Sequence, residues 1–192
     1  MSNRSRIIIA LSSLLLVLTF FFPLWKIDLN APQYPEGLGL RIWLHQISGL
    51  KPNDLQSING LNHYIGMKPI EQDSIPELTI MPYIMIFMIL SGLAIALFKQ
   101  KKMVYIWLIL FVILGIIGLY DFYLWGYEYG HNLNPNAPIK VPGMTYQPPL
   151  IGSKQLLNIN AVSLPSISSF LILISILLII TTIYLDKKKE IK

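Results

Sequence analysis

The sequence contains no cysteine and few charged residues, and both absences limit what the protein can be. Without cysteine the chain cannot form disulfides, thiolate zinc sites or iron–sulfur clusters, and it cannot perform the dithiol chemistry of membrane thiol oxidoreductases. Charged residues make up only 13% of the 192 positions, whereas a soluble domain normally carries about 25%. Hydrophobic residues account for 54% and concentrate in four long runs, which indicates an integral membrane protein.

Familiar enzyme motifs are also absent. The chain has no Gly-x-Ser-x-Gly, no His-Glu-x-x-His and no glycine-rich phosphate loop that ends in lysine. No hydrophobic run contains an acid–base pair, so a proton relay is not expected. The two halves show no internal repeat, which many secondary transporters have. These absences predict a protein that is not an enzyme.

Four hydrophobic runs have the length of membrane spans, each close to the ~20 residues that a helix needs to cross a ~30 Å hydrocarbon core. The first follows Arg4 and Arg6, as a secretory signal would, but no small-x-small cleavage site follows it. It is therefore predicted to remain as a span, with Leu24-Trp25-Lys26 as its interfacial anchor. The spans are predicted at Ile7 to Leu24, Ile80 to Phe98, Met103 to Leu124 and Pro165 to Leu185.

The distribution of lysine and arginine predicts the orientation. Nine lie in short segments on one side of the membrane: Arg4, Arg6, Lys99, Lys101, Lys102, Lys187, Lys188, Lys189 and Lys192. Six lie in two long loops on the other side: Lys26, Arg41, Lys51, Lys68, Lys140 and Lys154. The positive-inside rule places both termini in the cytoplasm. The short lysine clusters fit anionic lipid better than nucleic acid.

The predicted fold is an all-α membrane protein, a four-helix bundle with a small, mixed, loop-rich extracytoplasmic cap. The predicted segments are residues 1–25 (tip and first span), 26–79 (loop one), 80–125 (second and third spans, with the turn 99–102), 126–163 (loop two) and 164–192 (fourth span and basic tail).

Loop one shows signals of regular structure. Residues 39–47 alternate like a strand, with Leu40 on one face and Arg41 on the other. Asp54 is predicted to cap a helix that Gly66 ends, and residues 74–77, Ser-Ile-Pro-Glu, resemble a capping box at the start of the second span. Loop two is rich in proline, asparagine and glycine, which predicts an extended cover without regular helix or strand.

Soft potential metal ligands gather on the cap side of the chain. Thioether and imidazole groups without thiolate suit copper. The predicted ligands are His63, Met67, Met144, Met81 and Met85. Met88 extends the methionine stripe of the second span, and His45 and His131 lie in the same compartment. The alternative is packing, because methionine is a flexible filler of apolar interfaces.

Two further features of the spans have structural and functional explanations. Asp121 is an acid at the edge of the third span, where neighbouring aromatic residues place it near the outer interface and favour a structural role. Small residues pair on two spans, Gly92 with Ala96 and Gly115 with Gly118, and allow helices to approach closely. Packing within the bundle and contact with a partner subunit are both open for these pairs.

Several loop segments resemble a family of small four-span bacterial membrane proteins found near nitrous oxide reductase accessory genes in Bacteroidetes-like genomes. The matching segments are Tyr34 to Leu38, Ile58 to Met67, Ala137 to Met144 and Tyr146 to Gly152. The resemblance covers both loops and the four-span layout. It implies a place in a bacterial inner membrane and an accessory or assembly role around a copper enzyme. His63, Met67 and Met144 lie inside the matching segments.

The predicted function is therefore a membrane accessory protein that helps deliver copper to, or assemble, a copper enzyme such as nitrous oxide reductase. Its predicted partners are the lipid bilayer and a protein in a membrane or periplasmic complex, and no nucleic acid. Two alternatives are open. One is a structural subunit whose cap docks a partner without metal, and the other is a permease for small solutes or ions.

Overall fold

The structure is a computed structural model that describes residues 2–190. Of the basic tail, Lys192 and the side chains of Lys188 and Lys189 lie outside the described residues. Four helices are long and apolar enough to cross a membrane, as predicted. They are α1 (Asn3–Leu15, continued by the 3₁₀ turn η1, Leu16–Phe20), α3 (Glu77–Phe98), α4 (Lys101–His131) and α5 (Ile167–Glu190).

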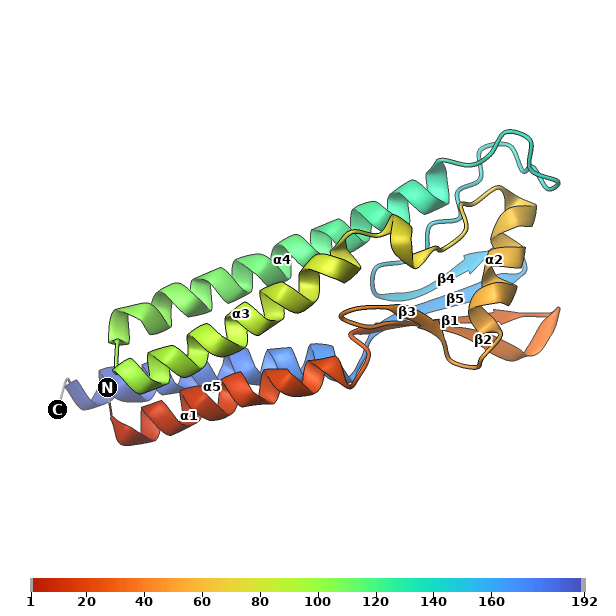
Figure 1. Cartoon of the computed structure of the whole chain (residues 1–192). Coiled ribbons are helices and arrows are strands. Elements are labelled where there is room, and N and C mark those ends of the chain that lie inside the picture. The colour runs from red at the N-terminus through yellow and green to blue at the C-terminus, as the bar shows by residue number, and fades with distance from the viewer. Residues whose placement is uncertain (1, 191–192) are drawn as a thin grey trace.

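The four helices run along one another, with both chain ends and the α3–α4 turn at one end of the bundle (Figure 1). We call this the terminal end. The opposite end carries a cap built from both loops (Figure 1). The cap contains the 12-residue helix α2 (Asp54–Ile65), the short 3₁₀ turn η2 (Gln72–Ser74) and a β-sheet.

The sheet corrects the all-α prediction. Its five antiparallel strands have the order β3-β2-β1-β5-β4. They are β1 (Trp25–Ala31), β2 (Tyr34–Ile42), β3 (Ile47–Gly49), β4 (Gly152–Leu156) and β5 (Ile159–Pro165). Loop two therefore contains two strands rather than only an extended cover. The predicted anchor at Trp25 and Lys26 is the start of the central strand.

The central strand β1 links the first span to the last one. It follows the first span directly, and its neighbour β5 leads directly into α5. Alternate β1 residues Trp25 and Ile27 are buried, and they pack in a hydrophobic cluster with Leu38, Leu40 and residues of α2 and α4. We call this the cap cluster. One face of the sheet is thus covered, as its alternating apolar side chains require.

Helix α2 forms where the sequence predicts it, with one change at its start. Gly66 ends it in the left-handed conformation at φ +83°, which glycine adopts without steric penalty. Asn53 rather than Asp54 occupies the N-cap position. The buried Asp54 carboxylate instead accepts hydrogen bonds from the backbone N–H groups of Gly39 (2.9 Å) and Lys51 (3.2 Å), which ties the helix to β2.

The predicted capping box before α3 is wrong. Ser74 lies in η2 and donates its hydroxyl to the Glu71 carbonyl at 2.7 Å, while Pro76 occupies the N-cap position of α3 without a side-chain hydrogen bond. The local 3₁₀ turn therefore uses the serine that a capping box would need. Pro82 lies inside α3, which continues through it. Helix α4 continues to His131, beyond the predicted span and into the cap.

Small and hydroxyl residues hold the bundle together. Gly92 of α3 lies so close to Ser13 of α1 that an added Cβ would clash with the Ser13 hydroxyl, so this glycine serves packing within the bundle. Ser175 donates to the Ser12 carbonyl at 3.1 Å and links α5 to α1. Such contacts replace the hydrophobic driving force that helices lack in lipid. Around Gly115 of α4, by contrast, a Cβ would meet nothing within 4 Å.

Candidate functional site

The structure separates the five predicted copper ligands into two groups. Met85 is buried in the hydrophobic cluster of the bundle, together with Met88. Met67 instead packs against the cap cluster, and Met81 is half-buried between the two clusters and contacts both. The methionine stripe of α3 therefore packs inside the molecule, as the alternative interpretation has it.

The other predicted ligands lie on the cap surface. His63 is exposed on the last turn of α2, where its ring meets the ring of Tyr64 edge-on at 6.0 Å between centroids. Met144 is half-buried in loop two, and His45 is exposed. His131 stacks on Tyr127 at 3.9 Å and its Nδ1 lies 3.0 Å from the Tyr127 carbonyl, so it is engaged within α4. Within residues 2–190, no group of three or more His, Cys, Asp or Glu side chains is placed to hold a metal ion.

Loop two folds back onto the end of α2 through backbone hydrogen bonds. The Ile139 N–H donates to the Tyr64 carbonyl at 2.9 Å, and the Asn134 N–H donates to the Gly66 carbonyl at 2.8 Å. Gly66 lies so close to loop two that an added Cβ would come within 2.9 Å of the Ala137 Cβ. Residues 134–139 of loop two are thus fixed to the end of α2, which carries His63.

This junction exposes apolar side chains to solvent. Tyr64 is 56% exposed, Ile139 47% and Val141 40%. They belong to the end of α2 and to the part of loop two that lies in the cap beyond the end of α4 (Figure 1). We call Tyr64, Ile139 and Val141 the distal surface. Sequence analysis missed it, although apolar residues between Pro138 and Pro142 in an otherwise polar loop were a visible signal.

An ion pair connects the segment that follows α2 to helix α4. Lys68, three residues after the end of α2, contacts Glu128 of α4 at 2.7 Å, and both side chains are half exposed. The hydrogen bond to the Glu128 carboxylate and its charge raise the pKa of Lys68 above its ordinary value. Nearby, the buried Tyr129 donates its hydroxyl to the Pro69 carbonyl at 3.3 Å. The last turns of α4 therefore position the end of loop one.

The proline-rich part of loop two covers an aromatic surface at the junction of bundle and cap. Gln147, Pro148 and Pro149 lie with Phe122 and Trp125 of α4 around a pocket of about 20 Å³. The indole Nε1 of Trp125 is buried without a hydrogen-bond partner in the part of the chain that the structure describes. Recognition of extended proline-rich segments by grooves lined with aromatic residues is common between proteins, and here both parts belong to one chain.

Asp121 lies half-buried in α4, and the carboxylate of Glu77 at the start of α3 is its electrostatic neighbour. Two carboxylates near each other do not form a salt bridge, so this residue adds no fixed contact to the site.

Comparison with known proteins gives no match: no protein-family model, no curated protein and no solved structure matches this chain.

Proposed function

We propose that the protein is a membrane-anchored accessory protein, not an enzyme, whose cap docks a partner protein through the distal surface. The observation that carries the proposal is the exposure of Tyr64, Ile139 and Val141 on two segments that backbone hydrogen bonds hold together. A fixed cluster of exposed apolar groups marks an interaction site on a protein surface. Aromatic side chains such as Tyr64 frequently dominate the binding energy of protein interfaces.

The cap also meets the geometric needs of docking. Backbone contacts in both loops limit the ordering that a partner would have to impose, and preorganisation of this kind favours binding. The four apolar helices would hold the surface at a fixed distance from the bilayer. The distribution of lysine and arginine supports an extracytoplasmic position for the cap.

Site-specific photocrosslinking in intact cells tests this proposal. A photoreactive amino acid at position 139 is expected to give one discrete crosslinked product, because it would lie inside the interface. The matched control is position 50. Leu50 is also exposed, at 59%, but it lies before the start of α2, whereas the distal surface lies at the end of α2. The product is expected to disappear when Tyr64→Ser is added. Equal crosslinking at positions 139 and 50 would contradict the proposal, and a product of twice the mass of the chain would identify the partner as a second copy.

Copper delivery is the second candidate function, and one observation favours it. The hydrogen bonds of Asn134 and Ile139 hold the part of loop two that leads to Met144 against the end of α2, next to His63 and Met67 in the sequence. One imidazole and two thioethers form a donor set suited to Cu(I). The resemblance of these segments to proteins near nitrous oxide reductase accessory genes agrees with such a role, and docking through the distal surface would bring the metal to its acceptor.

A Cu(I) competition titration on the detergent-solubilised protein tests the copper site. His63→Ala/Met67→Ala is expected to abolish tight binding, and Met144→Leu to weaken it. Met85→Leu is the matched control, because Met85 is buried in the bundle cluster, whereas Met67 is only partly buried and packs against the cap cluster. Loss of Cu(I) binding in the Met85→Leu variant would instead indicate that the methionines of α3 are copper ligands. If the wild-type protein binds no Cu(I) above detergent background, the copper role is excluded and docking without metal is retained.

The permease draws least support from the structure. Two pockets in the described part, of about 40 and 20 Å³, lie at opposite ends of the bundle. Neither is large enough for a solute beyond a few water molecules.

A further inference from the structure

We infer that the free edge of strand β4 binds an extended segment of a partner protein, which adds a sixth strand to the five-stranded sheet of the cap. The sheet has the order β3-β2-β1-β5-β4, so β4 (Gly152–Leu156) is an outer strand. The inference goes beyond docking through the distal surface, because it rests on main-chain groups of a different segment. Addition of a strand at an open sheet edge is a common mode of peptide recognition.

Alternate residues of β4 direct their main-chain groups away from the sheet. A two-residue turn joins β4 to β5, and Leu156 pairs with Ile159 beside that turn. In an antiparallel pair of strands, hydrogen-bonded residue pairs alternate with pairs that are not hydrogen-bonded. The pair next to a two-residue turn is a bonded one, so the N–H and C=O groups of Ser153 and Gln155 point away from β5. Within residues 2–190, no backbone hydrogen bond outside the sheet reaches either residue.

The described strand β4 lacks the usual protection of a sheet edge, which is given by proline, bulges or free lysine side chains. It contains no proline, its register with β5 is regular, and its three middle residues are exposed. The ammonium of its one lysine, Lys154, donates to the Gln147 carbonyl at 3.2 Å and is therefore held against loop two. The opposite edge differs, because β3 has only three residues and the Gln72 side chain donates to the Ile47 carbonyl at 3.1 Å.

The surroundings of β4 define the chemistry of the added segment. Ile151 and Leu157, at the two ends of the strand, are 60% and 38% exposed and offer apolar contacts. Lys154 is the only charged residue between positions 141 and 165. The matching segment is about five residues long, or about 17 Å. It has apolar ends and an acidic residue near its middle, beside the Lys154 ammonium.

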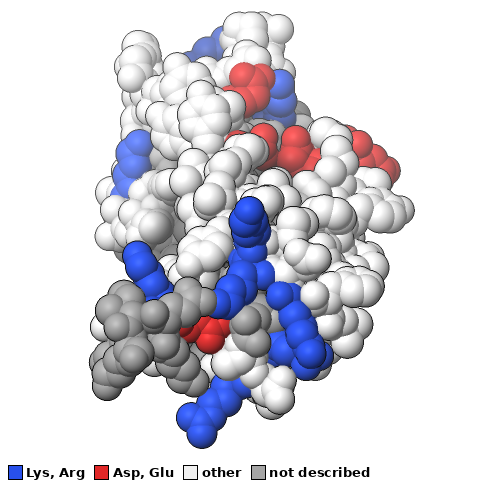
Figure 2. Space-filling view, turned by 90° about the vertical axis from the view of Figure 1, so that its left-hand side faces the viewer, with Lys and Arg blue, Asp and Glu red and all other residues white. Residues whose placement is uncertain are grey.

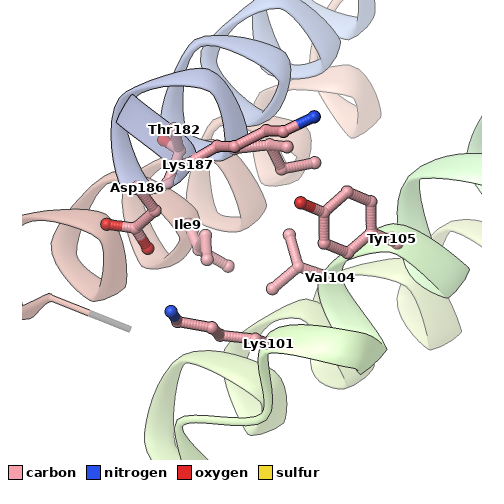
Figure 3. Close-up of a pocket in the computed structure, with 8 residues that line it drawn as sticks. Ile9, Lys101, Val104, Tyr105, Thr182, Asp186 and Lys187 are labelled. Carbon is pink, nitrogen blue, oxygen red and sulfur yellow. The ribbon is translucent and has the colours of Figure 1, made fainter. Parts of the chain in front are cut away.

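Diffuse positive charge lies at the opposite end of the molecule. Described Lys and Arg side chains gather at the terminal end of the bundle when the molecule is viewed from that end (Figure 2). The small pocket between α1, α4 and α5 lies there as well, with Tyr105 and Asp186 in its lining (Figure 3). An acidic segment that binds the cap is therefore held by the main chain of β4 and by Lys154 rather than by a general positive charge.

A second copy of the chain does not fit this edge. Strand β5 leads into α5 and runs toward the bundle, so its antiparallel neighbour β4 runs away from the bundle. Two copies inserted in the same direction in one membrane would bring their β4 strands together in parallel, related by a twofold axis. That symmetry places N–H groups opposite N–H groups, so the two strands cannot form a ladder of hydrogen bonds. A segment of another protein can run antiparallel to β4 and form the complete ladder.

Hydrogen–deuterium exchange of the full chain, measured by mass spectrometry in native membranes and again in detergent, tests the inference. The amides of Ser153 and Gln155 are expected to exchange at least roughly tenfold more slowly in native membranes, because the added strand protects them. Ser153→Pro removes an outward N–H that makes no bond to β5, and it is expected to abolish the difference at Gln155. Ser153→Ala keeps this N–H and is the matched control, which should retain the difference. Unchanged exchange of the β1 amides in the same data verifies that the sheet of the proline variant is folded.

The charge of the added segment is tested by Lys154→Glu, which should reduce the protection, and by Lys154→Arg, which should retain it. Equal exchange in membranes and detergent would overturn the inference, as would protection that survives Ser153→Pro or is lost in Ser153→Ala. Protection that rises with the concentration of the purified protein would identify a second copy at the edge and would overturn it as well. The readout lies in β4, whereas docking through the distal surface is read at position 139, so either proposal can fail alone.

Discussion

The indole N–H of Trp25 donates a hydrogen bond of 2.8 Å to the hydroxyl of Ser163, a residue 138 positions later in the chain. The bond joins β1 to β5, and each strand is continuous with a membrane helix at the opposite end of the sequence. Ser163 in turn donates to the Leu150 carbonyl at 3.0 Å and so also anchors the proline-rich segment. The centre of the sheet therefore couples the first and last spans to loop two.

Replacement of Ser163 by alanine is expected to destabilise the cap by about 1–3 kcal/mol, because the buried Trp25 N–H loses its acceptor. Unfolding of the detergent-solubilised protein by denaturant, followed by tryptophan fluorescence, measures the change. Ser153→Ala on the exposed edge strand β4 is the control and should have little effect. Equal stability of the two variants would mean that the hydrogen bond contributes nothing net.

Gly92→Ala is expected to destabilise the bundle by about 1–3 kcal/mol, since its Cβ would enter the space of the Ser13 hydroxyl. Gly115→Ala should be neutral or stabilising, because the site is open and alanine favours the helix by up to about 1 kcal/mol. Thermal unfolding in detergent compares the two variants. Ser13→Ala removes the clashing hydroxyl and should rescue Gly92→Ala in part. If Ser13→Ala does not restore stability to Gly92→Ala, the contact with the Ser13 hydroxyl is not the cause of the destabilisation.

The Lys68–Glu128 ion pair predicts a pH dependence at the alkaline end. Because pairing raises the pKa of Lys68 in the folded state above 10.5, its stabilising effect is complete below that pH. It is lost as the pH rises through the folded-state pKa. The difference in stability between wild type and Lys68→Met should be small, since both side chains are half exposed, and should vanish at high pH. A difference that persists there would point to packing rather than charge.

The orientation of the chain is open to a direct test because the protein has no cysteine of its own. In spheroplasts, Lys140→Cys is expected to react with a membrane-impermeant maleimide, as an extracytoplasmic cap requires. Lys102→Cys should react only after the membrane is permeabilised. The reverse pattern of labelling would invert the predicted topology.

The spans could be predicted because their physical requirement is local. A helix in lipid needs about 20 apolar residues, and the charges beside it are visible in the sequence. The end of α2 could also be predicted from a local signal, because Gly66 adopts the left-handed conformation there. The capping box at Ser74 failed because the same local signal also suits a 3₁₀ turn.

The sheet and the distal surface could not be predicted in the same way. Strand β1 follows directly on the first hydrophobic run, so its alternation was hidden, and its pairing with β5 is a contact between distant segments. The junction of loop two with α2 depends on backbone groups of Ile139 and Tyr64, which every residue type possesses. The burial of Met85 and Met88 likewise depends on which face of α3 meets the bundle.

The central claim, that the distal surface docks a partner, is tested most directly by cysteine accessibility at Ile139. Ile139→Cys and the control Leu50→Cys are labelled with a maleimide in native membranes and again after purification in detergent. A docked partner predicts that position 139 is protected in native membranes and becomes reactive on purification, while position 50 reacts equally in both. Full reactivity of position 139 in native membranes would contradict the claim.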